Sequence, residues 1–463
     1  MPDQVRPSQL EVNAFDGSGR AHSPLADGWR RWTLQHAPPA VRAFLRAPPR
    51  ADPRDWRDQR VGWGLVLPFN PALTSAELET AVDAPEPIQE LVRRRGTNGR
   101  PASVLRHVPE DGHIGFLRRG AVDLPVNQSL YGTGERSVPR YLLIYARPDQ
   151  IPWEVQYSLQ SHRCVGRLSL EGEGLDNYVA ALLDEWKDAG AEGAGHDAAL
   201  VWAADHRNGD ITSLMRESIA APVAERLRSD PDIGPGTHFI DGSREDASAA
   251  ALAHALAARR PGFIVSTSHG MTGPLDQVDL MTAQLGLPVD SNYQLVKPDV
   301  LLRDWQPGGA IWYAHACCGA GSDVRTLFDG LLEQGSAVDL LLQGVTRCGA
   351  RVAPLPQALL GARRPLRAFI GHVEPTFNWT LQQRETRQFT TDPLLSGLYE
   401  ELFQPLPVGL ALAPLYAQLG GLYVDYERFL RKTSHFQMLH RLLVVRDTQS
   451  TVILGDPTVA LPI

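Results

Sequence analysis

The sequence contains little cysteine and almost no lysine, and each scarcity removes a class of protein. Four cysteines in 463 residues, Cys164, Cys317, Cys318 and Cys348, are too few for the disulfide framework of a small secreted domain. Lysine occurs only three times, so arginine supplies almost all of the positive charge. The net charge of −8 also differs from the basic balance of a general nucleic-acid binder. We therefore expect reduced thiols and no nucleic-acid partner.

Long apolar runs are missing as well. No run reaches the ~18 apolar residues that can span a bilayer, and the longest candidate, residues 406–422, is broken by proline and glycine. The N-terminal residues lack the apolar core of a secretory signal. These features predict a cytoplasmic protein that does not engage a membrane. The length predicts roughly two to four structural units.

Composition and periodicity divide the chain into three parts. Residues 1–60 are rich in Pro, Arg and Asp and show little periodicity. Residues 61–195 alternate apolar strands with an amphipathic helix and end in the Gly/Ala-rich linker 189–195. Residues 196–463 alternate strands and helices regularly, with helices dominating 393–443. This pattern predicts an α/β fold with a mostly parallel sheet flanked by helices. Its first α/β subdomain would precede a second, reactive one.

Short apolar runs predict the strands of this sheet, and apolar residues at helical spacing predict the helices. The predicted strands are 62–69, 141–145, 165–170, 198–204, 238–240, 262–267, 309–314, 366–370 and 451–454. The predicted helices that precede the C-terminal helical region are 175–188, 211–228, 247–259 and 324–332.

Two of the predicted strands are followed by side chains that can react. His269 follows the strand 262–267, and Cys317 follows the strand 309–314. Ligands bind beyond the carboxyl ends of the strands in an open α/β sheet, so neighbouring strands would bring both side chains to one edge. There the imidazole can take the thiol proton, and the thiolate can attack a carbonyl carbon. The backbone N–H groups of Gly270 and Cys317 are candidates for an oxyanion hole.

These motifs resemble those of caspase-fold cysteine proteases. Residues 315–319 read His-Ala-Cys-Cys-Gly, similar to the caspase motif Gln-Ala-Cys-x-Gly. Residues 268–270 read Ser-His-Gly, and the histidine precedes the cysteine by 48 positions (317 − 269). Caspases have their histidine at about 50 residues upstream. The motif departs from the caspase pattern at His315, which replaces glutamine.

The first half resembles the gingipain branch of this group more closely. Residues 141–145, 149–152 and 165–167 resemble the non-catalytic first α/β subdomain of gingipains, and 454–457 resembles the strand that often ends their catalytic unit. The resemblance covers roughly residues 140–460 and implies a caspase–hemoglobinase-like sheet. Gingipains are secreted, whereas no secretory signal is recognisable here.

The resemblance also implies an activity. The protein would be a cysteine endopeptidase that forms a thioester with protein or peptide substrates and needs no cofactor, with Cys317 as nucleophile and His269 as base. Relatives in bacteria suggest a regulated protease, in antiviral defence or cell death, that a protein partner activates. The rival hypothesis is a catalytically silent binding or regulatory protein that retains the fold.

Several other residues near these motifs have alternative interpretations. Cys318 is expected to be a packed thiol beside the nucleophile Cys317, and His315 a hydrogen-bonded structural histidine. His372 follows another strand and either lines the cleft or is structural. The sequence has neither Cys-x-x-Cys nor His-Glu-x-x-His, so no metal site is predicted.

The resemblance places a specificity-determining residue after the first strand of the reactive subdomain, where residues 205–210 read Asp-His-Arg-Asn-Gly-Asp. Asp205 and Asp210 would favour Arg or Lys before the scissile bond, because a buried charge must be paired. Arg207 or Arg216 would favour Asp instead. Two carboxylates and the gingipain-like first half favour a basic residue. Alternatively, all of these are solvated loop charges.

Overall fold

The computed structural model describes the following residues of the chain: 9–15, 20–24, 50–97, 99, 101–109, 114–187, 193–207, 209–383, 386–404, 406–430 and 435–461. The chain divides into two compact units, Met1–Ala51 and Asp52–Ile463. In the first unit, β1 (Gln9–Phe15) and β2 (Arg20–Pro24) pair as an antiparallel hairpin. This hairpin lies within the segment that the sequence predicts to be irregular.

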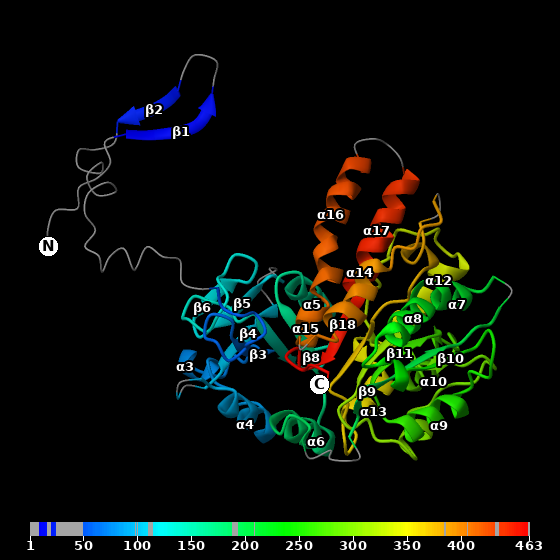
Figure 1. Ribbon diagram of the computed structural model, residues 1–463. Helices are drawn as coiled ribbons and strands as arrows, with labels where there is room; N and C mark the ends of the chain where they lie inside the picture. The colour runs from blue at the N-terminus through cyan, green and yellow to red at the C-terminus, as the bar shows by residue number, and fades with distance from the viewer. Residues whose placement is uncertain are drawn as a thin grey trace. The chain divides into compact units, whose positions relative to one another are not determined.

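A twelve-stranded sheet runs through the second unit, in the order β10-β9-β11-β14-β17-β18-β8-β7-β3-β4-β5-β6. Figure 1 shows this sheet among the helices that flank it. Its strands are β3 (Trp63–Pro68), β4 (Ser103–His107), β5 (Phe116–Arg119), β6 (Val122–Pro125), β7 (Tyr141–Tyr145), β8 (Cys164–Leu168), β9 (Gly195–Ala203), β10 (His238–Asp241), β11 (Pro261–Thr267), β14 (Ile311–His315), β17 (Ala368–His372) and β18 (Thr451–Gly455). Neighbours are parallel except for β17–β18, β4–β5 and β5–β6. The predicted α/β fold with a mostly parallel sheet is thus confirmed.

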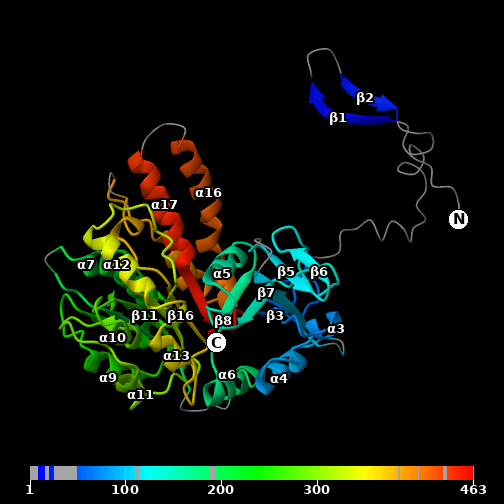
Figure 2. The same cartoon turned by 180° about the vertical axis from the view of Figure 1, so that it is seen from behind.

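Helices flank the sheet, and α16 and α17 form a hairpin that extends beyond it (Figures 1 and 2). The longer ones are α4 (Glu86–Arg94), α5 (Trp153–Gln160), α6 (Gly172–Leu183), α8 (Ala221–Ser229), α9 (Ala249–Arg259), α12 (Ala337–Thr346), α16 (Ala413–Leu430) and α17 (His435–Ser450). Among the described helices, none has both the length and the apolar character needed to cross a membrane.

The strand β18 joins the two halves of the sheet. It pairs antiparallel with β17 and parallel with β8, although it comes last in the chain. The following residue, Asp456, is fully buried, accepts a hydrogen bond from Trp63 Nε1 at 2.9 Å and pairs with Arg95. The C-terminal segment is therefore anchored to the first half. The predicted boundary near residue 195 falls between two halves of one sheet, inside the compact unit Asp52–Ile463.

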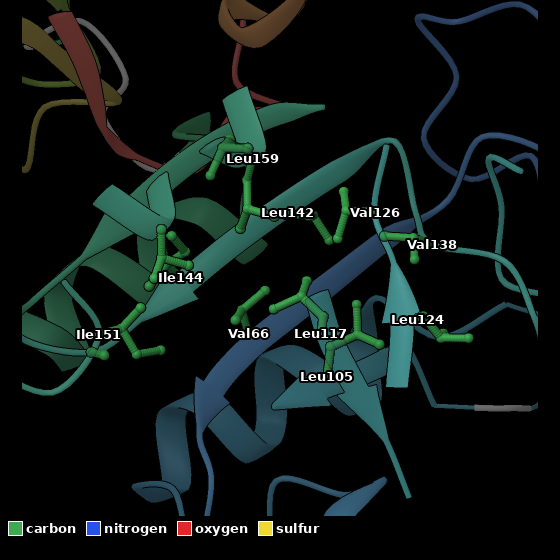
Figure 3. Packing of buried hydrophobic residues seen from close by; sticks show 13 residues of the cluster. Val66, Leu105, Leu117, Leu124, Val126, Val138, Leu142, Ile144, Ile151 and Leu159 are labelled. Carbon is green, nitrogen blue, oxygen red and sulfur yellow. The ribbon is translucent and has the colours of Figure 1, made fainter. Parts of the chain in front are cut away.

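The first half has an apolar core of its own. Side chains from its strands and from α5 meet on one face of the sheet, among them Val66, Leu105, Leu142, Ile144 and Leu159 (Figure 3). Each of these five side chains is fully buried. Such burial contributes on the order of 2 kcal/mol for each aliphatic side chain, which offsets the entropy lost on ordering the strands.

The prediction of a helix at 324–332 is wrong. These residues form turns, because the buried Glu374 fixes the backbone there. Its carboxylate accepts a hydrogen bond from Thr326 Oγ1 at 2.9 Å and another from Leu327 N at 3.0 Å. A tertiary contact that is 48 residues away in sequence therefore overrides the local helical spacing.

Candidate active site

The two reactive segments lie on neighbouring strands. The strands β11 and β14 pair in parallel, with Thr267 opposite His315. His269 and Cys317 each follow two residues later, so both lie just beyond the carboxyl ends of adjacent strands. The condition that these two strands be neighbours is thereby met, and the two residues are at the edge where open α/β sheets bind ligands.

Gly270 brings the two segments into direct backbone contact. A Cβ atom on Gly270 would lie 1.9 Å from the carbonyl oxygen of Cys317 and 2.9 Å from its nitrogen. Gly270 also pairs with Pro288 in the short ladder of β12 (His269–Gly270) and β13 (Pro288–Val289). Because Met271 N donates to Leu287 O, Gly270 occupies a non-hydrogen-bonded position of that ladder. Its N–H is therefore not used by the pairing with Pro288.

Replacing Gly270 with alanine should disable the site without a change in its chemical groups. The added methyl group overlaps Cys317 O, so the cysteine backbone must move. If the protein cleaves peptides, as the resemblance implies, kcat/KM on a peptide substrate should fall by about 100-fold or more, as when one oxyanion donor is displaced. The matched control is Gly421→Ala in α16, where a Cβ meets nothing within 4 Å. Equal activities of the two variants would contradict this packing.

Cys317 is a partly exposed residue, whereas Cys164, Cys318 and Cys348 are buried. Burial raises the pKa of Cys317, and the hydrogen bond that Thr376 N donates to its Sγ at 3.3 Å only partly offsets this effect. Within the described residues, Sγ is hydrogen-bonded to Thr376 and not to His269. The resting thiol is therefore protonated at neutral pH and needs a base before it can attack.

Cys318 is a packed thiol, as the sequence predicts. Its side chain is fully buried in an apolar cluster with Met281, Leu285, Val345 and Cys348, and this burial raises its pKa well above the usual value. Its backbone adopts a left-handed conformation with φ of 56°. A non-glycine residue in that conformation is strained, and such strain is often found at functional sites. The turn directs the two adjacent cysteines to different environments.

The structure pairs His269 with Asp210, which the sequence analysis assigns to a specificity pocket. His269 Nε2 donates to Asp210 Oδ2 at 3.0 Å. Burial acts to raise the pKa of Asp210, but hydrogen bonds from Thr212 and His269 outweigh it and hold the pKa below its usual value. The carboxylate is therefore ionised and can only accept, so Nε2 carries the proton and Nδ1 has the free lone pair. Nδ1 is then the atom that can act as a base.

His206 is a residue of this site that the sequence analysis did not single out. Its ring stacks on His269, with centroids 5.2 Å apart, and on Tyr293, with centroids 4.1 Å apart. Its Nε2 donates to the backbone oxygen of Asp290 at 2.8 Å. The stack holds the His269 ring against a buried neighbour. His206 and Asp210 are four residues apart and follow the predicted strand 198–204, and this spacing is the sequence signal that indicates a role for His206 in the site.

The other residues predicted to set specificity have partners in the structure. Asp205 is buried, and its Oδ1 accepts hydrogen bonds from Arg207 N and Ser213 Oγ. Arg216 forms a two-bond ion pair with Asp241, at 2.5 and 2.6 Å. The alternative that all of these are solvated charges does not fit Asp205. It does fit Arg207, which is exposed.

His315 is hydrogen-bonded within the protein, as the structural interpretation requires. Its Nδ1 lies 2.9 Å from Tyr313 Oη, and burial lowers its pKa to about 4, so it is neutral. His372 packs edge-on against it, with ring centroids 4.8 Å apart. Both line a cavity of about 300 Å³ together with Asp447, whose pKa burial raises to about 7. The described lining of this cavity includes neither His269 nor Cys317, so His372 lines a cavity other than the site of the two reactive residues.

A second hollow, of about 400 Å³, lies at the carboxyl ends of β3, β7 and β8. None of the described residues that line it is a cysteine or a histidine. Its described lining therefore lacks a pair of cysteine and histidine like the one that follows β11 and β14. No family model, curated protein or solved structure matches the chain.

Proposed function

We propose that the protein is a caspase-like cysteine endopeptidase with Cys317 as nucleophile and His269 as general base. The observation that carries the proposal is the adjacency of β11 and β14, which brings the backbone of Gly270 against that of Cys317. The caspase-like motifs support the same assignment. The proposal is tested by mapping the new protein N-termini that the wild-type protein and Cys317→Ala each produce in a cell extract.

The proposed reaction has two halves. His269 Nδ1 takes the thiol proton, the Cys317 thiolate attacks the substrate carbonyl, and the N–H groups of Gly270 and Cys317 stabilise the oxyanion. The imidazolium then protonates the leaving amine, which leaves a thioester on Cys317. A water molecule, deprotonated by the same imidazole, hydrolyses the thioester and frees the thiol. Asp210 is a positioning residue that fixes the tautomer and orientation of His269.

We propose a cytoplasmic setting in which a protein partner activates the enzyme, in antiviral defence or cell death. The neutral thiol, hydrogen-bonded to Thr376 and not to His269, fits an enzyme that rests inactive until activated. The rival function, a catalytically silent binding protein, predicts the same neutral thiol, so this observation does not separate the two. Alkylation by iodoacetamide separates the two, because an active dyad makes Cys317 react far faster than Cys164 or Cys348.

Specificity for Arg or Lys before the scissile bond is part of the proposal. Since Asp210 pairs with His269, Asp205 becomes the candidate for the pocket charge. Within the part of the chain that the structure describes, the hydrogen bonds to its carboxylate go to Oδ1. In a panel of peptides that differ only at this residue, we expect Arg and Lys to be preferred. Asp205→Asn should lower kcat/KM for these peptides by about 100-fold and leave a norleucine peptide nearly unchanged. Preferential cleavage after Asp would contradict the proposed specificity.

A further inference from the structure

His206, Asp210 and His269 form a compact cluster of metal-binding atoms, and the proposed peptidase reaction uses His269 and Asp210 but gives no role to a metal ion. One atom from each residue, a ring nitrogen or a carboxylate oxygen, lies within 4.8 Å of the other two. His269 Nε2 is 3.0 Å from Asp210 Oδ2, and His206 Nδ1 is 3.9 Å from Asp210 Oδ1. Ligand atoms around tetrahedral Zn²⁺ lie roughly 3.4 Å apart, given Zn–N and Zn–O distances of about 2.1 Å.

The environment of His206 gives a second, independent indication. Its side chain is 1% exposed, and its Nε2 donates to Asp290 O, because a carbonyl oxygen can only accept. The neutral ring therefore has its lone pair on Nδ1, and this atom has no hydrogen-bond partner within the described residues. A buried lone pair that faces a carboxylate is unfavourable, and a cation bound between the two atoms would remove this cost. Metal-bound histidines characteristically donate their other N–H to a carbonyl or carboxylate in this way.

We propose that His206 Nδ1, His269 Nε2 and one carboxylate oxygen of Asp210 bind a single divalent transition-metal ion, with Zn²⁺ as the best fit, and that the bound ion holds the active site inactive. Two imidazoles and one carboxylate favour Zn²⁺ over Mg²⁺ or Ca²⁺, which prefer oxygen ligands. His269 and Asp210 are 36% and 30% exposed, so the ion enters from the side of the site that faces solvent.

Inhibition follows from the two nitrogens of His269. In the resting state Nε2 carries the proton and Nδ1 the lone pair. When Zn²⁺ binds Nε2, that nitrogen releases its proton to solvent and Nδ1 takes one up, so the ring stays neutral. Nδ1 then has no lone pair with which to take the proton of Cys317. The ion also occupies Asp210, the residue that orients the base. The inhibition rests on the proposed peptidase function, whereas the binding of the ion does not.

The binding is tested in the Cys317→Ala background, which removes the nearby thiol. Zn²⁺ affinity is measured by competition with a chromophoric chelator, and we expect one ion per chain. Adding His206→Phe, which keeps an aromatic ring in the stack, should weaken binding by at least about 100-fold, since one of three ligands is lost. The matched control is His254→Phe, at an exposed position of α9, and it should bind Zn²⁺ normally.

Two results would overturn the site. The first is Zn²⁺ affinity that His206→Phe leaves unchanged, and the second is Zn²⁺ binding that disappears in Cys317→Ala alone. X-ray absorption spectroscopy on the Zn²⁺-loaded wild-type protein tests the same three ligands, and it does not depend on the folding of a variant. We expect a nitrogen and oxygen shell with imidazole scattering, and a sulfur shell would contradict the assignment.

The regulatory role is tested separately, on peptidase activity. One equivalent of Zn²⁺ should abolish cleavage by chelator-treated wild-type protein, and EDTA should restore it. Relative to its own metal-free activity, His206→Phe should need at least about 100-fold more Zn²⁺ for half inhibition. Full activity of Zn²⁺-saturated wild-type protein would overturn the regulatory role. Absence of peptidase activity under every condition would instead count against the proposed function, and the binding experiment would still decide the metal site.

Discussion

Cys317→Ala should reduce kcat/KM for peptide cleavage by about 10⁴-fold or more, because the variant has no atom that can form the thioester. Cys317 is a partly exposed residue, and alanine removes only its sulfur atom, so we expect the thermal unfolding midpoint to stay close to that of the wild type. The measurement is steady-state cleavage of a fluorogenic peptide, combined with thermal unfolding of the same preparation.

Cys318→Ala is the matched control for the nucleophile. Its thiol is fully buried in an apolar cluster and has a raised pKa, so it cannot supply a thiolate to a substrate. The variant should lose stability through a small cavity, by on the order of 1 kcal/mol, and retain most of its activity. If Cys318→Ala were inactive and Cys317→Ala remained active, the nucleophile would be Cys318 and the assignment of Cys317 would be wrong.

His269→Ala should reduce kcat/KM by about 10³-fold, since general-base catalysis contributes factors of 10² to 10⁴. Because burial raises the pKa of Cys317, the thiolate fraction is small at neutral pH. The residual activity should therefore rise about tenfold for each pH unit, following the thiolate until the pH reaches the pKa of the thiol. The wild type should lack this steep dependence. The measurement is a pH–rate profile of both proteins.

Asp210→Asn separates positioning from catalysis in the same series. The amide keeps the shape of the carboxylate but no longer fixes which nitrogen of His269 carries the proton. We expect kcat to fall while KM changes little, by less than in His269→Ala, and the double variant should be no worse than His269→Ala. Additive losses in the double variant would contradict the view that Asp210 acts through His269.

Much of the sheet could be predicted because its strands are locally distinct. Every residue of β11 is buried, so its apolar run appears in the sequence, and the same holds for β14. The order of strands follows from tertiary packing and could not be derived in this way. The insertion of β18 between β17 and β8 depends on Asp456, whose partners Trp63 and Arg95 lie more than 350 residues away in sequence.

The same limit applies to the site. The positions of His269 and Cys317 could be predicted, since each follows a recognisable strand and one pairing of adjacent strands brings them together. The partnership of Asp210 with His269 spans 59 residues and depends on β9 lying beside β11. The stack of His206 on His269 depends on the same neighbour. Charges in loops give no local signal of their partners, so the sequence alone predicts substrate binding for Asp210 and does not reveal its contact with His269.

The most direct test of the proposed activity is the mapping of new protein N-termini by mass spectrometry. A cell extract is incubated with wild-type protein and, in parallel, with Cys317→Ala. The proposed function predicts new N-termini that appear only with the wild type, with Arg or Lys preceding most of the cleavage sites. Identical sets of N-termini from the two proteins would contradict it and favour the silent binding protein.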